Sequence, residues 1–452
     1  MTYETLKARI RGTVITMFDT SYAEAADALV WNGRKPERQA TVIVRAASTE
    51  DVQEAVRFAA EQGLSVSARG GGHQFTGIAA RAGMVIDLGA LDLLRIDVAG
   101  RSATVGPAVT NTRLSAALDR HGLAFPVGHC GDVTVSGYLL GGGVGWNSGE
   151  WGIACFSVLA VDVVMADGRM LTATAEEHSD IFWAARGAGP EFFGIVVAYR
   201  VRLYEAPRAL TSVVRVYPAS AAEAVADWAE RAVSRAPATV EFTAKIACTP
   251  DGPIIAAIAN VFAAGEAEAL AICSEFGRDA PDGAVEIAGP MPTPLAALYE
   301  MTGASTPKGS RYGVDSVWSD GSFAEALTAI LHGMGAAPSP QSFGLVALRS
   351  NARAVPTDAA FSRVGRVFST LYGIWTDASE DSANLGWLHN TVESCRSFAT
   401  GSYVGESDLD RPTAPLPTLS AEAGQRLRAL RAEHDPNGRF DVRAKSGSKT
   451  AA

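Results

Sequence analysis

The chain has 452 residues and a mass of 47.2 kDa, enough for two domains and a large hydrophobic core. Its net charge of −10 and isoelectric point near 5.3 argue against nucleic-acid or anionic-membrane partners. No apolar run is long enough for a membrane span, the N-terminal segment lacks the pattern of a secretory signal, and the five cysteines are scattered without metal or disulfide spacing. We therefore expect a cytoplasmic enzyme without a bound metal.

The first third of the chain alternates strand and helix patterns. A β-branched run at 41–44 predicts a strand, and Ser48 then begins a helix whose apolar positions recur at helical spacing. A further helix is predicted at 113–121. Other strands are predicted at 64–68, 83–88, 94–98 and 102–105. This order is typical of a βαβ-rich α+β domain.

The remaining two thirds begin with a predicted hairpin, in which strands 158–166 and 169–173 flank an Asp-Gly turn. From about residue 212 the composition becomes richer in alanine. Helices are predicted there at 221–233, 264–276 and 323–333, alternating with strands at 239–247 and 254–259. That alternation predicts a second α+β domain with its own sheet. A helix at 421–433, a turn at 435–440 and a small polar tail complete the chain.

A first glycine cluster, Arg69-Gly70-Gly71-Gly72-His73, follows a predicted strand. Three consecutive glycines allow a sharp turn and bring bare N–H groups against an anion such as a pyrophosphate. No helix start follows at the spacing of the dinucleotide-binding fingerprint. The segment is therefore either an anion cradle or a glycine-rich turn with a nearby histidine.

A second cluster, 128–145, places many glycines in a mostly apolar segment. Such a backbone is expected to press against something flat or charged. Cys130 lies at the edge of this cluster, as His73 does at the edge of the first. A free cysteine is also commonly a small buried hydrophobe, so both interpretations of Cys130 stay open here.

Four ordered segments, 69–77, 128–145, 180–207 and 435–440, together resemble the PCMH-type FAD-binding domain of the vanillyl-alcohol oxidase and p-cresol methylhydroxylase superfamily. The resemblance is to its berberine-bridge-enzyme-like branch, which also contains bacterial hydroxynicotine, oligosaccharide and aclacinomycin oxidases. The middle of the chain matches that branch only in order and size.

The resemblance implies that His73 bonds to the 8α-methyl carbon of the flavin and that Cys130 bonds to flavin C6, as in doubly linked members. It places further residues of both glycine clusters, and of the segment after Gly194, against the cofactor. These cofactor-binding candidates are Arg69, Gly70, Gly71, Gly72, Gly77, Val133, Gly137, Tyr138, Gly141, Gly142, Gly143, Ile195 and Val196.

The chain departs from the branch at two places. An Asp that usually follows the second cluster is missing from 152–156. A Tyr-x-Asn-Tyr-like signature before the final helix becomes Tyr403-Val404-Gly405-Glu406, so that Glu406 stands where the second tyrosine is expected. Glu406 is either a catalytic base, with its pKa raised by a partly apolar pocket, or an exposed loop acid. Tyr403 is the competing base.

The implied fold is α+β, with a two-part PCMH-type FAD-binding domain formed by residues 1–206 and 400–446. A central α+β substrate domain with an antiparallel sheet occupies 207–399, and 447–452 form a tail. The implied activity is an oxidase that transfers a hydride from an alcohol or amine carbon of a small organic substrate to covalently bound FAD, which O2 reoxidises. A dehydrogenase with another electron acceptor and a flavin-binding protein without turnover are the alternatives.

Several other side chains are weaker candidates. His389 is a candidate for the substrate wall, His129 either tunes the flavin or faces solvent, and His434 is expected at the surface. Four aromatic residues of the substrate domain form either a pocket or part of the core. They are Tyr312, Trp318, Tyr372 and Trp375. The sequence leaves the substrate and the oligomeric state open.

Overall fold

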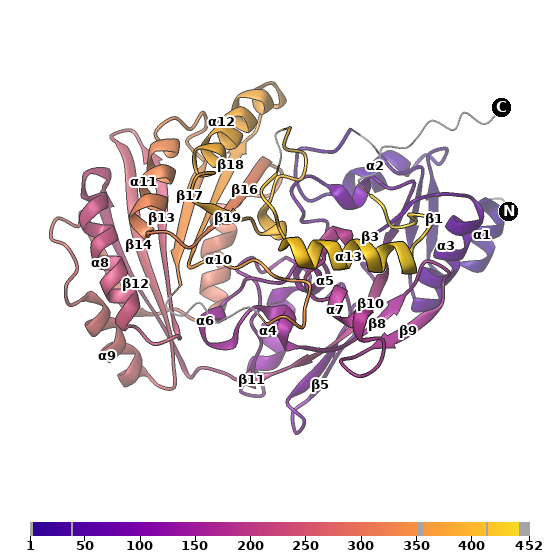
Figure 1. Ribbon diagram of the computed structural model, residues 1–452, viewed down its shortest axis with the longest axis horizontal. Helices are drawn as coiled ribbons and strands as arrows, with labels where there is room; N and C mark the ends of the chain where they lie inside the picture. Colours follow the sequence, from indigo (N-terminus) through magenta and orange to yellow (C-terminus); the bar gives the residue numbers. More distant parts are fainter. Residues whose placement is uncertain (1–2, 38, 350–355, 413–414, 443–452) are drawn as a thin grey trace.

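The computed structural model describes residues 3–37, 39–349, 356–412 and 415–442. Within these ranges the chain has an α+β fold, which confirms the predicted class. Two smaller sheets and their helices form the indigo-to-magenta part of the molecule, and the largest sheet forms the pink-to-orange part (Figure 1). The predicted tail at 447–452 lies outside the described residues.

The first sheet has the strand order β1-β2-β4-β3 and is parallel except for β1. Its strands are β1 (Thr13–Thr16), β2 (Val42–Arg45), β3 (Val66–Arg69) and β4 (Met84–Asp87). Helix α3 (Thr49–Glu61) buries its predicted apolar stripe on this sheet, and Ser48 caps it by accepting a hydrogen bond from the Asp51 amide. Helices α1 (Tyr3–Arg9) and α2 (Tyr22–Ala28) lie before β2 in the chain. The predicted strand–helix–strand order is confirmed.

The second sheet is antiparallel, with the order β5-β6-β10-β8-β9. Its strands are β5 (Leu94–Asp97), β6 (Ser102–Val105), β8 (Val158–Val164), β9 (Met170–Ala173) and β10 (Ile195–Arg202). Beside it lie the small strand pair β7 (Leu123–Ala124) and β11 (Tyr204–Glu205) and the helices α4 (Asn111–Asp119), α5 (Val135–Leu140), α6 (Ser148–Trp151) and α7 (Ser179–Ala184). The predicted hairpin is the β8–β9 pair.

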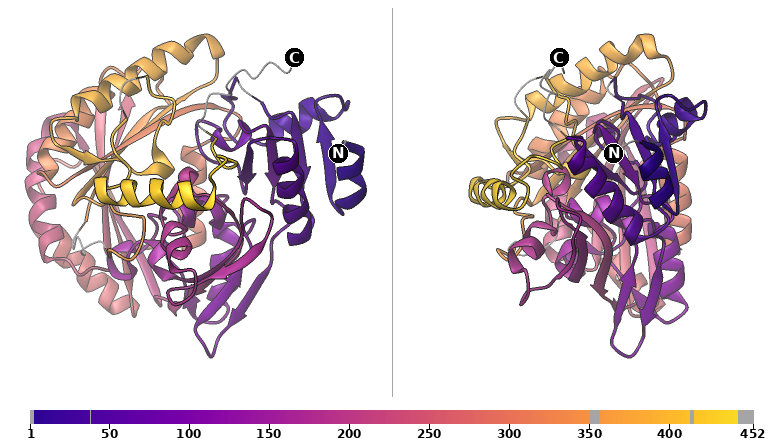
Figure 2. Two further views of the ribbon diagram at one scale, coloured as in Figure 1. Left: turned by 45° about the vertical axis from the view of Figure 1, so that its right-hand side comes forward. Right: turned by 90° about the vertical axis from the view of Figure 1, so that its right-hand side faces the viewer.

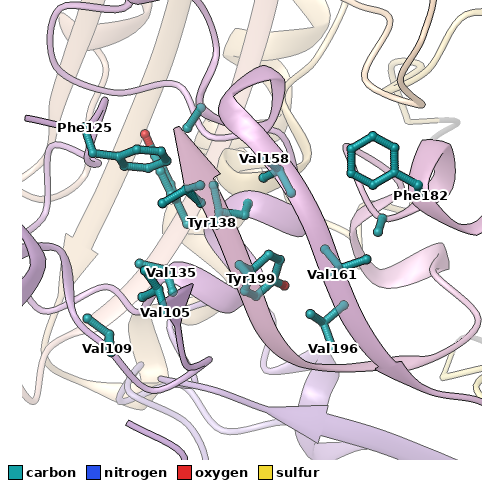
Figure 3. Packing of buried hydrophobic residues seen from close by; sticks show 14 of the residues in the cluster. Val105, Val109, Phe125, Val135, Tyr138, Val158, Val161, Phe182, Val196 and Tyr199 are labelled. Carbon is teal, nitrogen blue, oxygen red and sulfur yellow. The ribbon is translucent and has the colours of Figure 1, made fainter. Parts of the chain in front are cut away.

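The core of this second unit holds the long glycine cluster in place. Val135 and Tyr138 of α5 pack with Val196 and Tyr199 of β10 in one apolar cluster (Figure 3). The Tyr199 hydroxyl also donates to the carbonyl of Ser136 at 3.1 Å, which ties α5 to the sheet. Because α5 is held by both apolar packing and this hydrogen bond, it can keep the adjacent glycine loops in one conformation.

The third sheet is antiparallel throughout, with the order β15-β12-β14-β13-β17-β18-β16-β19. Its strands are β12 (Ala209–Pro218), β13 (Val240–Thr249), β14 (Gly252–Ala263), β15 (Glu286–Pro292), β16 (Arg311–Ser319), β17 (Phe343–Leu348), β18 (Val367–Trp375) and β19 (Ala399–Gly401). Helices α8 (Ala222–Arg235), α9 (Glu266–Gly277), α11 (Phe323–Met334) and α12 (Asp381–Ser394) cover its outer face (Figures 1 and 2).

The inner face of this sheet turns toward the other two sheets, and α10 (Leu295–Ser305) lies on that side (Figure 1). The predicted helices and strands of this region are confirmed to within a few residues. The domain boundaries at 206/207 and 399/400 stay predictions, although the second of them falls inside β19.

The C-terminal segment returns to the first half of the chain. Helix α13 (Ala421–His434) packs against α7 through Leu427. Further on, the carbonyl of Arg439 accepts a hydrogen bond of 2.7 Å from the amide of Val66, at the start of β3. Among the described residues, no helix is both long and apolar enough to cross a membrane.

Candidate cofactor and active site

A cavity of about 660 Å³ lies where the two glycine clusters, α10, β18 and the C-terminal segment meet. Its volume is in the range of small-molecule and cofactor sites. The wall contains His73, Cys130, Tyr403 and Glu406. One cavity therefore collects the chemically distinctive residues that the sequence singled out.

The first glycine cluster continues directly from β3 into the cavity wall. At Gly70 a side chain would clash with its surroundings, because a Cβ atom there would lie 2.0 Å from the Ser136 hydroxyl oxygen. His73 stacks on Trp31, with ring centroids 5.4 Å apart. Burial lowers the pKa of His73 to about 4, so the imidazole is neutral near pH 7. A neutral ring keeps the nitrogen lone pair that a bond to carbon requires.

Cys130 lies in the second cluster between two glycine positions that face the same cavity. The Asn111 side chain donates to the Cys130 carbonyl at 3.0 Å, which fixes the local backbone. Burial raises the pKa of the Cys130 thiol to about 12, with a smaller contribution from Glu406. The thiol is thus protonated in this state, and it must lose that proton before it can act as a nucleophile.

Helix α5 supplies part of the cavity wall. Gly137 lines the cavity, and a Cβ atom there would meet no other atom within 4 Å, so it would project into open space. The Tyr138 hydroxyl donates to the Pro126 carbonyl at 2.6 Å, which makes it a fixed wall element. The remaining predicted cofactor residues on the wall are Gly70, Gly71, Gly72, Val133, Gly141, Ile195 and Val196.

Four predicted cofactor residues do not line the cavity: Arg69, Gly77, Gly142 and Gly143. The Arg69 side chain pairs with Asp87 at 3.2 Å and also donates to the Gly71 carbonyl, so it braces the glycine loop from behind. The three glycines have positive φ angles of 64°, 115° and 87° and serve as turns. Their contribution to the site is indirect, through backbone conformation.

Gly142→Ala is expected to reduce the free energy of unfolding by about 2–4 kcal/mol. Alanine is strained at a φ of 115°, and its Cβ would lie 2.3 Å from the Phe361 ring. Urea unfolding measures the change. Gly137→Ala is the matched control, because it should leave stability within about 0.5 kcal/mol yet lower FAD occupancy. Equal stability loss in both variants would contradict the assignment of Gly142 to a structural turn and of Gly137 to the cofactor wall.

Glu406 ends a short 3-10 turn, Val404–Glu406, and its side chain lies on the cavity wall. Burial raises its pKa above the ordinary value, against hydrogen bonds involving Thr370 and Tyr372 that lower it. Its Oε2 atom is buried and has no hydrogen-bond partner among the described residues. The alternative of an exposed loop acid is therefore wrong.

Tyr403 lies deeper in the wall and is surrounded by other groups. Its ring packs edge-on against Phe361 and Phe368. Burial raises the pKa of its hydroxyl, while backbone hydrogen bonds involving Val144 and Gly143 lower it. The hydroxyl is thus engaged by the second glycine cluster, which suits an anchor of the wall better than a proton acceptor.

Sequence reasoning missed most of the aromatic wall. Trp31, Phe75 and Tyr299 line the cavity although they come from three separate regions of the chain. Of the four aromatic candidates, only Tyr372 reaches the wall, whereas Tyr312, Trp318 and Trp375 are buried in the core. Strand periodicity could have identified one face of β18, but not that this face meets the glycine clusters.

The weaker histidine candidates have specific partners. His389 contacts Asp408 at 2.7 Å and is absent from the cavity wall, so its interpretation as a wall residue is wrong. His434 is mostly buried, stacks on Phe193 and contacts Asp180 at 2.8 Å, which corrects its expected surface position. His129 does line the cavity. Within the described ranges, no group of His, Cys, Asp and Glu side chains is arranged to hold a metal ion.

Comparison with known proteins agrees with this geometry. A family model described as an FAD binding domain matches residues 40–174. FAD-linked oxidoreductase penO of Penicillium crustosum is 29% identical over 441 residues, covering 96% of this chain and 97% of that protein. (R)-6-hydroxynicotine oxidase of Paenarthrobacter nicotinovorans is 37% identical over 200 residues, covering 44% of this chain and 43% of that protein. The structure of the Physcomitrella patens protein BBE-like 1 superimposes with a TM-score of 0.83 at 19% identity, covering 97% and 98% of the two chains.

The cavity fits FAD in that the backbone at Gly137 meets it without a side chain, so a flat group can approach closely there. The fold and this cavity define a flavin-dependent enzyme, an FAD-linked oxidoreductase. These comparisons support the resemblance to PCMH-type, berberine-bridge-enzyme-like FAD oxidoreductases that the sequence motifs implied.

Proposed function

We propose that the protein is an oxidase that removes a hydride from an alcohol or amine carbon of a small organic substrate and uses O2 as the final electron acceptor. One observation carries the proposal: His73, Cys130 and the carboxylate of Glu406 share the wall of one cavity. When bound, FAD supplies two-electron redox chemistry, and the protein supplies orientation, electrostatics and proton handling.

The proposal includes attachment of FAD to both His73 and Cys130, in which each new bond to a flavin carbon would replace a C–H bond and O2 would take up the two electrons released. The two residues lie on separate loops but line the same cavity, so one cofactor ring can reach both. His73 is neutral, as a nitrogen nucleophile must be. Cys130 needs a proton acceptor, and its neighbour Glu406 is a carboxylate that interacts with it electrostatically. Attachment at two points would restrict movement of the ring relative to Glu406.

Glu406 is the proposed catalytic base. Its raised pKa lies closer to neutral pH than that of an ordinary carboxyl group. A general base is most effective when its pKa is near the working pH. The Glu406 carboxylate, on the cavity wall, would accept the proton that a substrate hydroxyl or amine loses. The name of the hydroxynicotine oxidase relative supports an amine as one substrate class, and alcohols remain the other.

Turnover is expected to consume oxygen and release hydrogen peroxide in equal amounts. The test is a panel of alcohols, sugars and cyclic amines assayed with an oxygen electrode and peroxide detection. Flavin reduced without oxygen should recover its absorbance within seconds after air is admitted. Recovery over many minutes, together with rapid reaction with a quinone dye, would instead assign a dehydrogenase. A flavin that no substrate reduces would favour a binding protein.

A further inference from the structure

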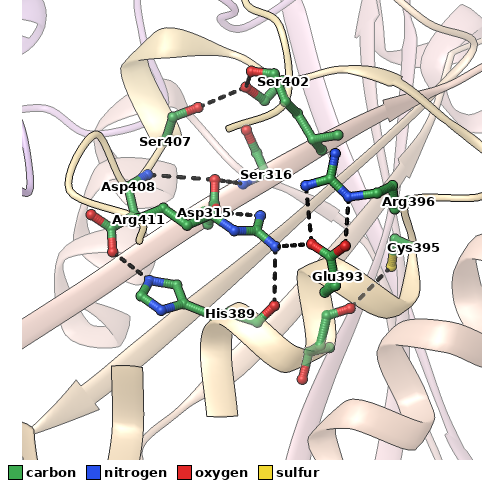
Figure 4. Close-up of polar contacts among 12 residues, drawn as sticks. Asp315, Ser316, His389, Glu393, Cys395, Arg396, Ser402, Ser407, Asp408 and Arg411 are labelled. Atoms are coloured by element: carbon green, nitrogen blue, oxygen red, sulfur yellow. Dashed lines mark hydrogen bonds and ion pairs between the residues drawn. The ribbon is translucent and has the colours of Figure 1, made fainter. Parts of the chain in front are cut away.

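A buried charge network begins two residues after the Glu406 turn, at Asp408. It consists of Asp315 from β16, His389 and Glu393 from α12, and Asp408 and Arg411 from the C-terminal segment (Figure 4). We call these five residues the Arg411 network. Only 3–8% of the surface of Asp315, Asp408 and Arg411 is exposed. Because burying charges is costly unless each is paired, their geometry is closely constrained.

Each contact of the network joins the C-terminal segment to the large sheet or its helix. The Arg411 guanidinium lies 3.2 Å from Asp315 and 2.8 Å from Glu393, and donates to the His389 carbonyl at 3.2 Å. The His389 ring lies 2.7 Å from the carboxylate of Asp408. The segment is thus attached to β16 and α12 at both Asp408 and Arg411.

The attachment continues to the residues that flank Glu406. On one side, the Ser407 hydroxyl bonds to the Tyr403 carbonyl at 2.8 Å and to Ser402 at 3.0 Å. On the other, the Tyr403 amide donates to the hydroxyl of Ser316, next to Asp315, at 3.1 Å. Glu406 lies between these fixed points, two residues before Asp408 and three after Tyr403. Its side chain has hydrogen bonds involving Thr370 and Tyr372, and its flanks fix the backbone that carries it.

The same turn also contacts the flavin-binding side. The Gln74 side chain donates to the Ser407 carbonyl at 3.3 Å, and Gln74 directly follows His73. The Asp410 carboxylate pairs with Arg81, which lies between β3 and β4 of the first sheet. The Glu406 turn is therefore held between the loop that carries His73 and the Arg411 network.

We propose that the Arg411 network positions Glu406, so that His389 and Asp408 act on catalysis through the geometry of the base. The inference rests on the proposed role of Glu406 as the base. A buried ion network adds little net stability over an apolar core of the same shape, so a gain in positional precision is a physical reason for its presence. Misplacement of a catalytic group by about 1 Å can reduce a rate by about a hundredfold.

The pKa values of the two buried carboxyl groups, Asp315 and Asp408, fit their charged state near neutral pH. Burial tends to raise the pKa of Asp408, but hydrogen bonds from His389 and the Asp410 amide hold it below its ordinary value. Burial raises the pKa of Asp315 to about 6, and Arg411 opposes that rise. Arg34 also faces Asp408, and Arg396 pairs with Glu393. Acidification that protonates Asp315 would weaken its contact with Arg411.

The test compares His389→Ala with His389→Gln in the flavin-loaded enzyme. Alanine removes the contact with Asp408, whereas the glutamine amide can still donate to it. His389→Ala should slow anaerobic flavin reduction at saturating substrate about tenfold, with KM changed less than twofold and the flavin spectrum unchanged. His389→Gln should restore the rate to within about threefold of the wild type.

A second readout does not depend on activity. Hydrogen–deuterium exchange in peptides that cover 402–412 should increase in His389→Ala and not in His389→Gln. The matched control is Asp381→Asn, which disrupts a half-buried pair with Arg311 at the other end of α12. That variant should leave both the exchange of 402–412 and the reduction rate unchanged.

A double-mutant cycle with Glu406→Gln separates positioning of the base from general destabilisation. If His389 acts through Glu406, His389→Ala should have almost no further effect in the Glu406→Gln background. An equal tenfold loss in both backgrounds, or a wild-type rate in His389→Ala, would overturn the positioning role while leaving the base proposal intact. If Glu406→Gln alone reduces flavin at the wild-type rate, the base proposal fails, and the positioning role fails with it.

Discussion

Glu406→Gln is expected to slow anaerobic flavin reduction by at least about a hundredfold, because a glutamine amide cannot accept the proton that the substrate loses. The wild-type rate should fall as the pH drops through the raised pKa of Glu406, since only the deprotonated form is a base. The variant should lack that acidic limb. Stopped-flow measurement of flavin absorbance across pH tests both expectations.

Tyr403→Phe is the matched comparison. Its hydroxyl is buried among aromatic rings and already engaged by backbone groups, so its removal should change the rate only a few-fold. The reverse pattern, with a slow Tyr403→Phe and an active Glu406→Gln, would make Tyr403 the base. A change in KM alone for Glu406→Gln would make Glu406 a substrate contact.

The second large effect concerns attachment of the cofactor. After acid precipitation of the wild-type protein, the flavin should stay with the pellet, and a tryptic digest should contain one flavin joined to the His73 and Cys130 peptides. Each single variant, His73→Ala or Cys130→Ala, should retain the flavin through the remaining bond. The double variant should release it completely into the supernatant.

Two results would contradict double attachment. Flavin released wholly from the wild-type protein would exclude any covalent bond. An unchanged flavin spectrum and unchanged peptide linkage in Cys130→Ala would return Cys130 to a packed thiol, which its raised pKa in the protein without flavin also permits. Cys248→Ala is a suitable control, because Cys248 is a partly buried thiol on β13 that does not line the cavity.

Local sequence patterns were sufficient to predict the elements that carry the cofactor site. The Ser48 cap, the apolar stripe of α3 and the Asp-Gly hairpin all act over a few residues, and the structure confirms them. The glycine clusters were also informative, because Gly70 and Gly137 occupy positions where a side chain would be excluded or would enter the cavity. Backbone requirements of this kind are visible in residue type alone.

Long-range packing accounts for what could not be predicted. Whether Glu406 faces solvent or the cavity depends on contacts with β16, α12 and the loop after His73, all distant in sequence. The position of His389 in the predicted substrate region suggests a wall residue. Its actual partner, Asp408, lies on the C-terminal segment, and no local pattern predicts that this segment packs against α12. Gly142 and Gly143 were assigned to the wall by motif, although their positive φ angles mark turns behind it.

The return of the C-terminus to β3 has a consequence for synthesis of the protein on the ribosome. Val66 bonds to Arg439, and Phe440 and Val442 form part of the same cavity wall as His73. Domains generally fold in order as the chain emerges, but this cavity needs both the first seventy or so residues and the last described ones. The cavity therefore cannot be completed before residues 439–442 have been synthesised and have reached β3.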